Sequence, residues 1–152
     1  MINTLLDKAI RAAQSAKLLL DNGDDSGACN RAYYAMFDAA SAALRAFEAP
    51  IIDEKGRIAS NHSGIISSFG LLIVKEGHLP RELGRALNKA EIIRLEADYL
   101  AGAIKKEDAL WMVEISEKFV DSVKELVLEI QSDTCVVCGA IPCICKKEGQ
   151  RG

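Results

Sequence analysis

The sequence has little that would break a helix and no stretch that would cross a membrane. It contains only 3 prolines among 152 residues, and it lacks the run of about 18 apolar residues that a transmembrane helix needs. The first residues, MINTLLDKAIRAAQ, mix charged and apolar side chains and do not have the pattern of a signal peptide. These absences predict a cytoplasmic protein that makes no membrane contact.

A large excess of charge of one sign is also missing. The formal net charge is −3, which argues against a general coat for nucleic acid held by phosphate neutralisation. A local basic patch stays compatible with this charge, because binding depends on where the cations lie. The 5 cysteines are expected to be free thiols or metal ligands in a cytoplasmic chain.

Apolar residues spaced by three and four positions predict helices along most of the chain. Four of the expected helices run over about 3–21, 25–48, 62–76 and 105–131, and a further one opens at Pro80 with a bend before ADYLAG at 97–102. No segment of useful length has the period of a strand. Asp25 or Ser26 is expected to cap the second helix, and Ser60 or Asn61 the third. The sequence therefore predicts an all-α, up-and-down antiparallel bundle of four to five helices over residues 1–131.

The second of these helices carries an alanine seam and a polar face. Alanines at 28, 32, 35, 39, 42 and 46 fall close to one line, so a neighbouring helix can approach closely and this helix is expected to be central. Arg31, Tyr34, Asp38 and Arg45 share another face through steps of three, four and seven residues. That face is either a solvated charged surface or the wall of a cleft or interface.

The segment NRAYYAMFDAASAAL at 30–44 resembles the signature helix of the HEPN superfamily (higher eukaryotes and prokaryotes nucleotide-binding). Three further stretches follow in the order shown by its small stand-alone prokaryotic branch: NHSGIISSFG at 61–70, LPRELGRALNKA at 79–90 and RLEADY at 94–99. The leading AIRAAQSAKLLL is also similar to the first helix of that branch. The resemblance covers about residues 3–130.

The resemblance implies a helical bundle that forms a homodimer and binds RNA or a nucleotide. In active relatives the domain is a metal-independent endoribonuclease that uses an arginine and a histidine four to six residues apart. Many members are the toxin-like half of a two-gene module with a minimal nucleotidyltransferase, which acts as the antitoxin. In some pairs this transferase adenylylates a tyrosine near the catalytic histidine. No cofactor is expected for the bundle.

This chain departs from the ribonuclease motif. Four residues follow Arg94, and the next position, where the motif has a histidine, holds Tyr99. Arg57 and His62 have the spacing by count, but His62 is expected to cap or pack at the start of the third helix. Tyr99 is equally compatible with a structural, hydrogen-bonded role. The candidate catalytic residues are Arg94 and Tyr99, and the candidate binding residues of a polar cleft are Arg31, Tyr34, Asp38 and Asp98.

Residues 132–152 form a cysteine-rich tail that contains Cys135, Cys138, Cys143 and Cys145. The opening C-x-x-C-G resembles a zinc knuckle, although the second pair follows sooner than in ordinary zinc ribbons. Two interpretations stay open, a Zn²⁺ site built from the four thiolates and free thiols on a flexible tail. The alternative to an RNA-binding protein is accordingly a non-enzymatic, dimeric helical binding or scaffold module with a zinc-binding tail.

Overall fold

The computed structural model describes residues 2–51, 55, 61–99 and 104–133, and all regular structure in these ranges is helical. The elements are α1 (Ile2–Asp21), α2 (Asp25–Ala46), α3 (His62–Ser68), the π-helix η1 (Phe69–Val74), α4 (Arg81–Tyr99) and α5 (Lys106–Asp133). The prediction of an all-α chain is confirmed. The predicted tail, with Cys135, Cys138, Cys143 and Cys145, lies outside the described residues.

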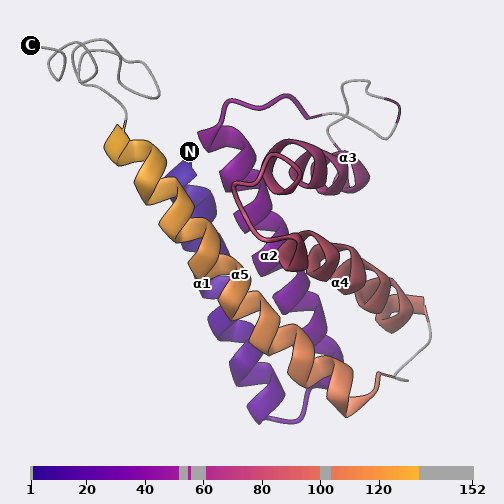
Figure 1. Ribbon diagram of the computed structural model, residues 1–152. Coiled ribbons are helices and arrows are strands. Elements are labelled where there is room, and N and C mark those ends of the chain that lie inside the picture. Colours follow the sequence, from indigo (N-terminus) through magenta and orange to yellow (C-terminus); the bar gives the residue numbers. More distant parts are fainter. Residues whose placement is uncertain (1, 52–54, 56–60, 100–103, 134–152) are drawn as a thin grey trace, which may run out of the picture.

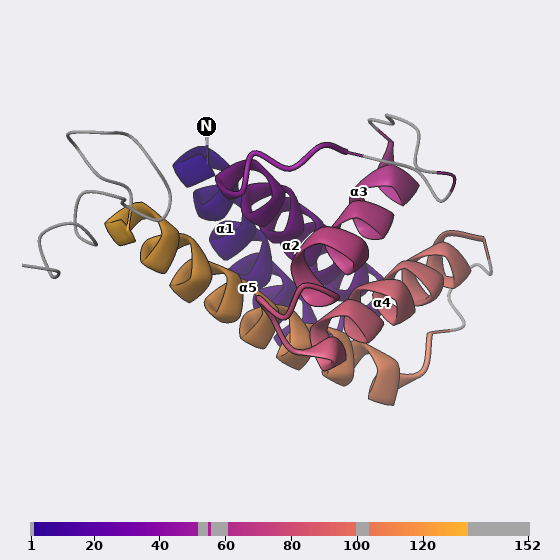
Figure 2. The same ribbon diagram turned by 45° about the horizontal axis from the view of Figure 1, so that its top comes forward.

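Helix α2 is the centre of the molecule and contacts each of the other five elements. Helices α1, α2 and α5 lie side by side, with α1 antiparallel to both of its neighbours (Figure 1). Helices α3 and α4 cross α2 obliquely on another side, as both views show (Figure 2). The antiparallel packing was predicted. The sequence also predicted a simple up-and-down order, and the structure differs because α3 and α4 cross α2 obliquely.

Small side chains explain the close packing of α1 and α2, the pair with the most extensive contact. The alanine seam of α2 is buried along its whole length, and α1 meets α2 with buried alanines of its own, Ala9, Ala12, Ala13 and Ala16. Cys29 is also fully buried, and burial raises the pKa of its thiol to about 11. Cys29 is therefore a small core residue.

The helix starts are fixed by side-chain caps. The Asp24 carboxylate accepts a hydrogen bond of 2.9 Å from the Gly27 amide, so α2 is capped one residue earlier than predicted. The predicted cap of α3 is confirmed at Asn61, whose side-chain oxygen accepts a bond of 2.9 Å from Gly64.

The third predicted helix is divided into the short α3 and the π-helix η1. A π-helix follows a wider spacing than an α-helix, and this difference is too small to be read from the apolar pattern of a few residues. The change of winding still buries Phe69 and Ile73 against the core. In the described part of the chain no helix is both long and apolar enough to span a membrane.

Candidate functional site

A pocket of about 410 Å³ opens between α1 and α2 and combines cations with aromatic rings. Its lining consists of three basic side chains, two aromatic rings and one carboxylate: Lys8, Arg11, Arg31, Tyr34, Phe37 and Asp38. We call it the cationic pocket. Lys8 and Arg11 lie one helical turn apart on α1, while the other four residues come from one face of α2.

The single carboxylate of the cationic pocket belongs to Asp38. Its Oδ2 lies 3.9 Å from Nζ of Lys8, and only 15% of the Asp38 side chain is exposed. Burial raises the pKa of Asp38 above its ordinary value of 3.8, while the positive charges of Lys8, Arg31 and His62 act in the opposite direction. With one carboxylate against three cations, the pocket favours an anionic ligand.

His62 packs against the two aromatic rings that line the cationic pocket. Its ring stacks on Phe37 with centroids 4.2 Å apart, and its edge faces Tyr34 at 6.0 Å. Its Nδ1 lies 3.0 Å from the hydroxyl oxygen of Tyr33. Burial raises the pKa of Tyr33, so that hydroxyl stays protonated, and the tautomer of His62 decides which of the two groups donates the hydrogen bond. His62 thus packs at the start of α3, as predicted, while Asn61 provides the cap.

Arg94 of α4 lies over the rings of Tyr33 and Tyr34. Its guanidinium carbon is 4.7 Å from the ring centroid of Tyr33 and 6.0 Å from that of Tyr34. Its Nη1 donates to Oδ2 of Asp98 at 3.2 Å, one turn further along α4. Within the described residues its buried Nε has no hydrogen-bond partner. The ring faces and the carboxylate therefore fix the position of Arg94.

The structure divides the sequence-derived candidates into three places. Arg31, Tyr34 and Asp38 line the cationic pocket. Arg94 and Asp98 pair with each other next to Tyr33 and Tyr34. Tyr99 lies at the last position of α4 and is 82% exposed, so the part of the structure that is described does not place it in a packed polar cluster.

Sequence reasoning missed three residues that line the site, Lys8, Arg11 and Phe37, and it did not place His62 beside them. Lys8 and Arg11 had a usable signal, since two cations three residues apart share one helix face. His62 had none, because its contact with Tyr33 joins positions that are 29 residues apart in the sequence.

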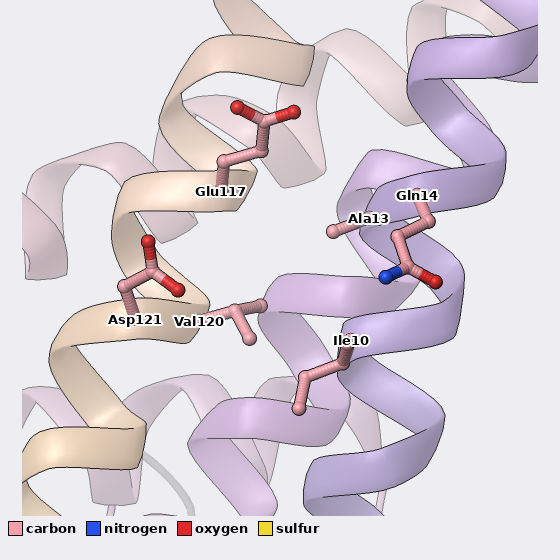
Figure 3. A pocket seen from close by; sticks show the side chains of 6 residues that line it. All are labelled: Ile10, Ala13, Gln14, Glu117, Val120 and Asp121. Carbon is pink, nitrogen blue, oxygen red and sulfur yellow. The ribbon is translucent and has the colours of Figure 1, made fainter.

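A second pocket, of about 230 Å³, lies on the other flank of α1, against α5. Its lining contains two carboxylates and no basic side chain: Ile10, Ala13, Gln14, Glu117, Val120 and Asp121. Figure 3 shows Glu117 and Asp121 projecting from α5 on the side that faces Gln14 of α1. We call it the acidic pocket. The described residues contain no group of three or more His, Cys, Asp or Glu side chains that could hold a metal ion.

Comparison with known proteins agrees with the resemblance in the sequence. The HEPN domain matches residues 2–126. A protein of Methanocaldococcus jannaschii described as a putative toxin is 33% identical over 85% of this chain and 90% of its own length. UPF0332 proteins of Gloeobacter violaceus and Thermotoga maritima are 33% and 32% identical over 82% of this chain, and over 94% and 89% of their own lengths. The chain therefore belongs to the HEPN domain family.

Proposed function

We propose that this protein binds RNA or a nucleotide through the cationic pocket, as the toxin-like half of a two-gene module. One observation carries the binding proposal. Three basic side chains, Lys8, Arg11 and Arg31, surround the same pocket as the rings of Tyr34 and Phe37. Phosphate and an unpaired base are the two chemical groups that this combination recognises.

The chemistry of each side chain suits that ligand. The guanidinium groups of Arg11 and Arg31 can each offer two parallel N–H donors to a phosphate. The rings of Tyr34 and Phe37 offer flat apolar faces on which a base can stack, and such stacking is largely independent of sequence. Asp38 lowers the net positive charge of the pocket and so weakens its attraction for an anion.

The proposed activity is binding, and cleavage is a separate question for Arg94 and Tyr99. If the bound RNA is cleaved, the relatives' chemistry implies that no metal is needed and that Arg94→Ala abolishes cleavage. Incubation of single-stranded RNA with the protein in the presence of a chelator answers this question directly. Intact RNA at every salt concentration would exclude the ribonuclease activity and leave the binding proposal standing.

The toxin-like role is supported by the similarity to the archaeal protein that is described as a putative toxin. We propose that the partner is a minimal nucleotidyltransferase encoded beside this gene, and that the protein acts as a homodimer. Expression of the chain alone is expected to slow the growth of a bacterial host, and co-expression of the partner to restore it. Normal growth at a high level of folded protein would contradict the toxin-like role.

Binding is tested by fluorescence anisotropy with a labelled single-stranded RNA. Three phosphate contacts predict that the logarithm of the affinity falls against the logarithm of salt concentration with a slope of about −2. Arg31→Gln is expected to weaken binding about tenfold, since it removes a charge-assisted hydrogen bond worth roughly 1.5–3 kcal/mol.

The matched control is Lys17→Gln on the same helix as Lys8. Lys17 is exposed and lies nine residues after Lys8, which places it on the opposite side of α1. Its substitution is expected to leave binding unchanged. Equal losses in Arg31→Gln and Lys17→Gln would show that net charge, and not the cationic pocket, governs the interaction.

A further inference from the structure

The acidic pocket has an apolar floor and a polar rim. Ala13 of α1 and Val120 of α5 are buried and form the floor, while Gln14, Glu117 and Asp121 are exposed at the rim. With the residues that the structure describes, neither Glu117 nor Asp121 forms an ion pair. The acidic pocket therefore presents two carboxylates that this part of the chain does not neutralise.

Further along α5, the same face has an exposed leucine. Asp121 and Leu128 are seven positions apart, so they lie on one side of the helix, two turns from each other. Leu128 is 55% exposed. Beyond Leu128, α5 ends at Asp133. One face of α5 thus offers an apolar contact near its end and two carboxylates further back.

The segment that follows α5 in the sequence has the complementary order of residue types. Residues 134–145 have no charged side chain, and a third of them are valine or isoleucine. Lys146 and Lys147 come directly after them, and residues 134–152 contain three basic side chains and one carboxylate in total. If this segment folds back along α5, its apolar part meets Leu128 before the lysines meet the carboxylates.

The length of the segment matches the distance to the acidic pocket. Asp121 and Glu117 lie 12 and 16 positions before Asp133, which corresponds to about 18 and 24 Å of helix. Lys146 is 13 positions after Asp133. A flexible chain of this length has a root-mean-square end-to-end distance of about 20 Å and a full extension of about 43 Å. The two lysines therefore reach the acidic pocket without stretching the chain.

We propose that residues 134–147 fold back along α5 and that Lys146 and Lys147 bind at the acidic pocket. The apolar part of the segment covers Leu128, and the two lysines pair with Glu117 and Asp121. Because the segment is joined to α5, its local concentration at the pocket is in the millimolar range, and ion pairs that are weak one by one then act together. This inference does not depend on the ligand of the cationic pocket, so it is tested separately from the proposed function.

The connection to α5 favours this segment over an occupant from outside. A separate basic protein loses translational and rotational freedom when it binds, whereas most of this freedom is already absent for a segment that is linked to the same helix. A metal ion is a poor match, because nowhere in the part of the chain that the structure describes do three or more His, Cys, Asp or Glu side chains gather.

Zero-length cross-linking with a carbodiimide tests this docking on the full chain. The reagent joins a lysine amine to a carboxylate that touches it, and trypsin digestion with mass spectrometry identifies the pair. A chelator and a reducing agent keep the cysteines of the segment metal-free and reduced. Lys146 and Lys147 are expected to be joined mainly to Glu117 and Asp121. The yield should fall at least threefold between about 0.05 and 0.5 M salt, because exposed charges are then screened.

The matched control is a pair of carboxylates on α5 that lie closer to the segment. Glu125 and Glu129 are exposed and are nearer to Asp133 in the sequence, so proximity alone would favour them over the acidic pocket. Cross-links from the two lysines that fall mainly on Glu125 and Glu129 would overturn the proposal. Cross-links between two copies, with a yield that rises with protein concentration, would also overturn it.

A charge swap provides an independent test. Glu117→Lys combined with Asp121→Lys is expected to reduce cross-linking from Lys146 and Lys147 at least fivefold at all α5 carboxylates, because the segment is then repelled. Adding Lys146→Glu and Lys147→Glu to the same chain is expected to restore cross-links between these four positions. No restoration in a variant whose circular dichroism matches the wild type would contradict the pairing.

Discussion

The two flanks of helix α1 have pockets of opposite charge. On the α2 side, Lys8 and Arg11 of α1 join Arg31 in the cationic pocket. On the α5 side, the acidic pocket contains Glu117 and Asp121 and no basic group. Positive and negative side chains are thus separated in space on a chain whose net charge is only −3. The difference teaches that charge location, and not total charge, defines where this protein can meet an anion.

The largest effect is expected from reversing charge in the cationic pocket. Arg11→Glu combined with Arg31→Glu should weaken binding of single-stranded RNA roughly 100-fold or more, because two charge-assisted contacts are lost and replaced by repulsion. The control, Lys17→Glu combined with Arg85→Glu, changes the net charge by the same amount at exposed positions elsewhere. Anisotropy at one salt concentration compares them, and similar losses would remove the distinction between the two flanks.

The next effect concerns the aromatic part of the cationic pocket. Tyr34→Leu keeps apolar bulk but removes the ring, and it should weaken RNA binding about tenfold, since base stacking contributes roughly 1–3 kcal/mol. Tyr34→Phe keeps the ring and should bind normally. Tyr99→Leu is expected to have no effect on affinity, because Tyr99 is 82% exposed at the end of α4. A loss in Tyr99→Leu equal to that in Tyr34→Leu would move the binding site toward α4.

A smaller effect, and a gain, is expected from Asp38. Asp38→Asn removes the carboxylate that opposes an anionic ligand and should strengthen RNA binding about threefold at neutral pH, as expected for one partly screened charge. In the wild type, binding should tighten as the pH falls through the raised pKa of Asp38, because protonation removes the same negative charge. The pH profile of Asp38→Asn is the reference that isolates the effect of this carboxyl group.

The same titration affects stability with a defined sign. The folded-state pKa of Asp38 lies above its unfolded value, so the stability linked to this group is complete at low pH and is lost as the pH rises through the folded pKa. Urea unfolding of wild type and Asp38→Asn as a function of pH measures this difference. If the stability of Asp38→Asn relative to the wild type falls as the pH rises, the raised pKa of Asp38 is contradicted.

The smallest effect is expected in the acidic pocket. Glu117→Gln combined with Asp121→Asn should change RNA affinity less than twofold at physiological salt, where exposed charges more than about 8 Å apart are largely screened. Anisotropy with the same RNA gives the comparison. A gain as large as that of Asp38→Asn would show that the sum of charges governs binding on both flanks.

Local rules were enough to predict much of this fold. The alanine seam identified α2 as the central helix, and the Asn61 cap followed from residue type and spacing. The same spacing placed Arg31, Tyr34 and Asp38 on one face. Each of these features depends on residues within a few turns of one helix, which is the range that sequence periodicity reports.

The rest of the site depends on packing between distant segments. Nothing local indicates that Lys8 and Arg11 meet Arg31, because this requires the crossing of α1 and α2. The contact of His62 with Tyr33 depends on where α3 docks, and the stacking of Arg94 depends on where α4 crosses. The sequence therefore indicated single side chains, while the cationic pocket itself is a product of tertiary structure.

Photo-crosslinking tests the central claim most directly. A single-stranded RNA that contains 4-thiouridine is crosslinked to the wild-type protein, which is then digested with trypsin and analysed by mass spectrometry. Cleavage after Arg31 and Arg45 releases residues 32–45, which contain Tyr34, Phe37 and Asp38 of the cationic pocket, while α5 yields residues 107–118 and 119–124 from the acidic pocket. The account predicts that the RNA adduct is on residues 32–45. An adduct confined to the α5 peptides would contradict it.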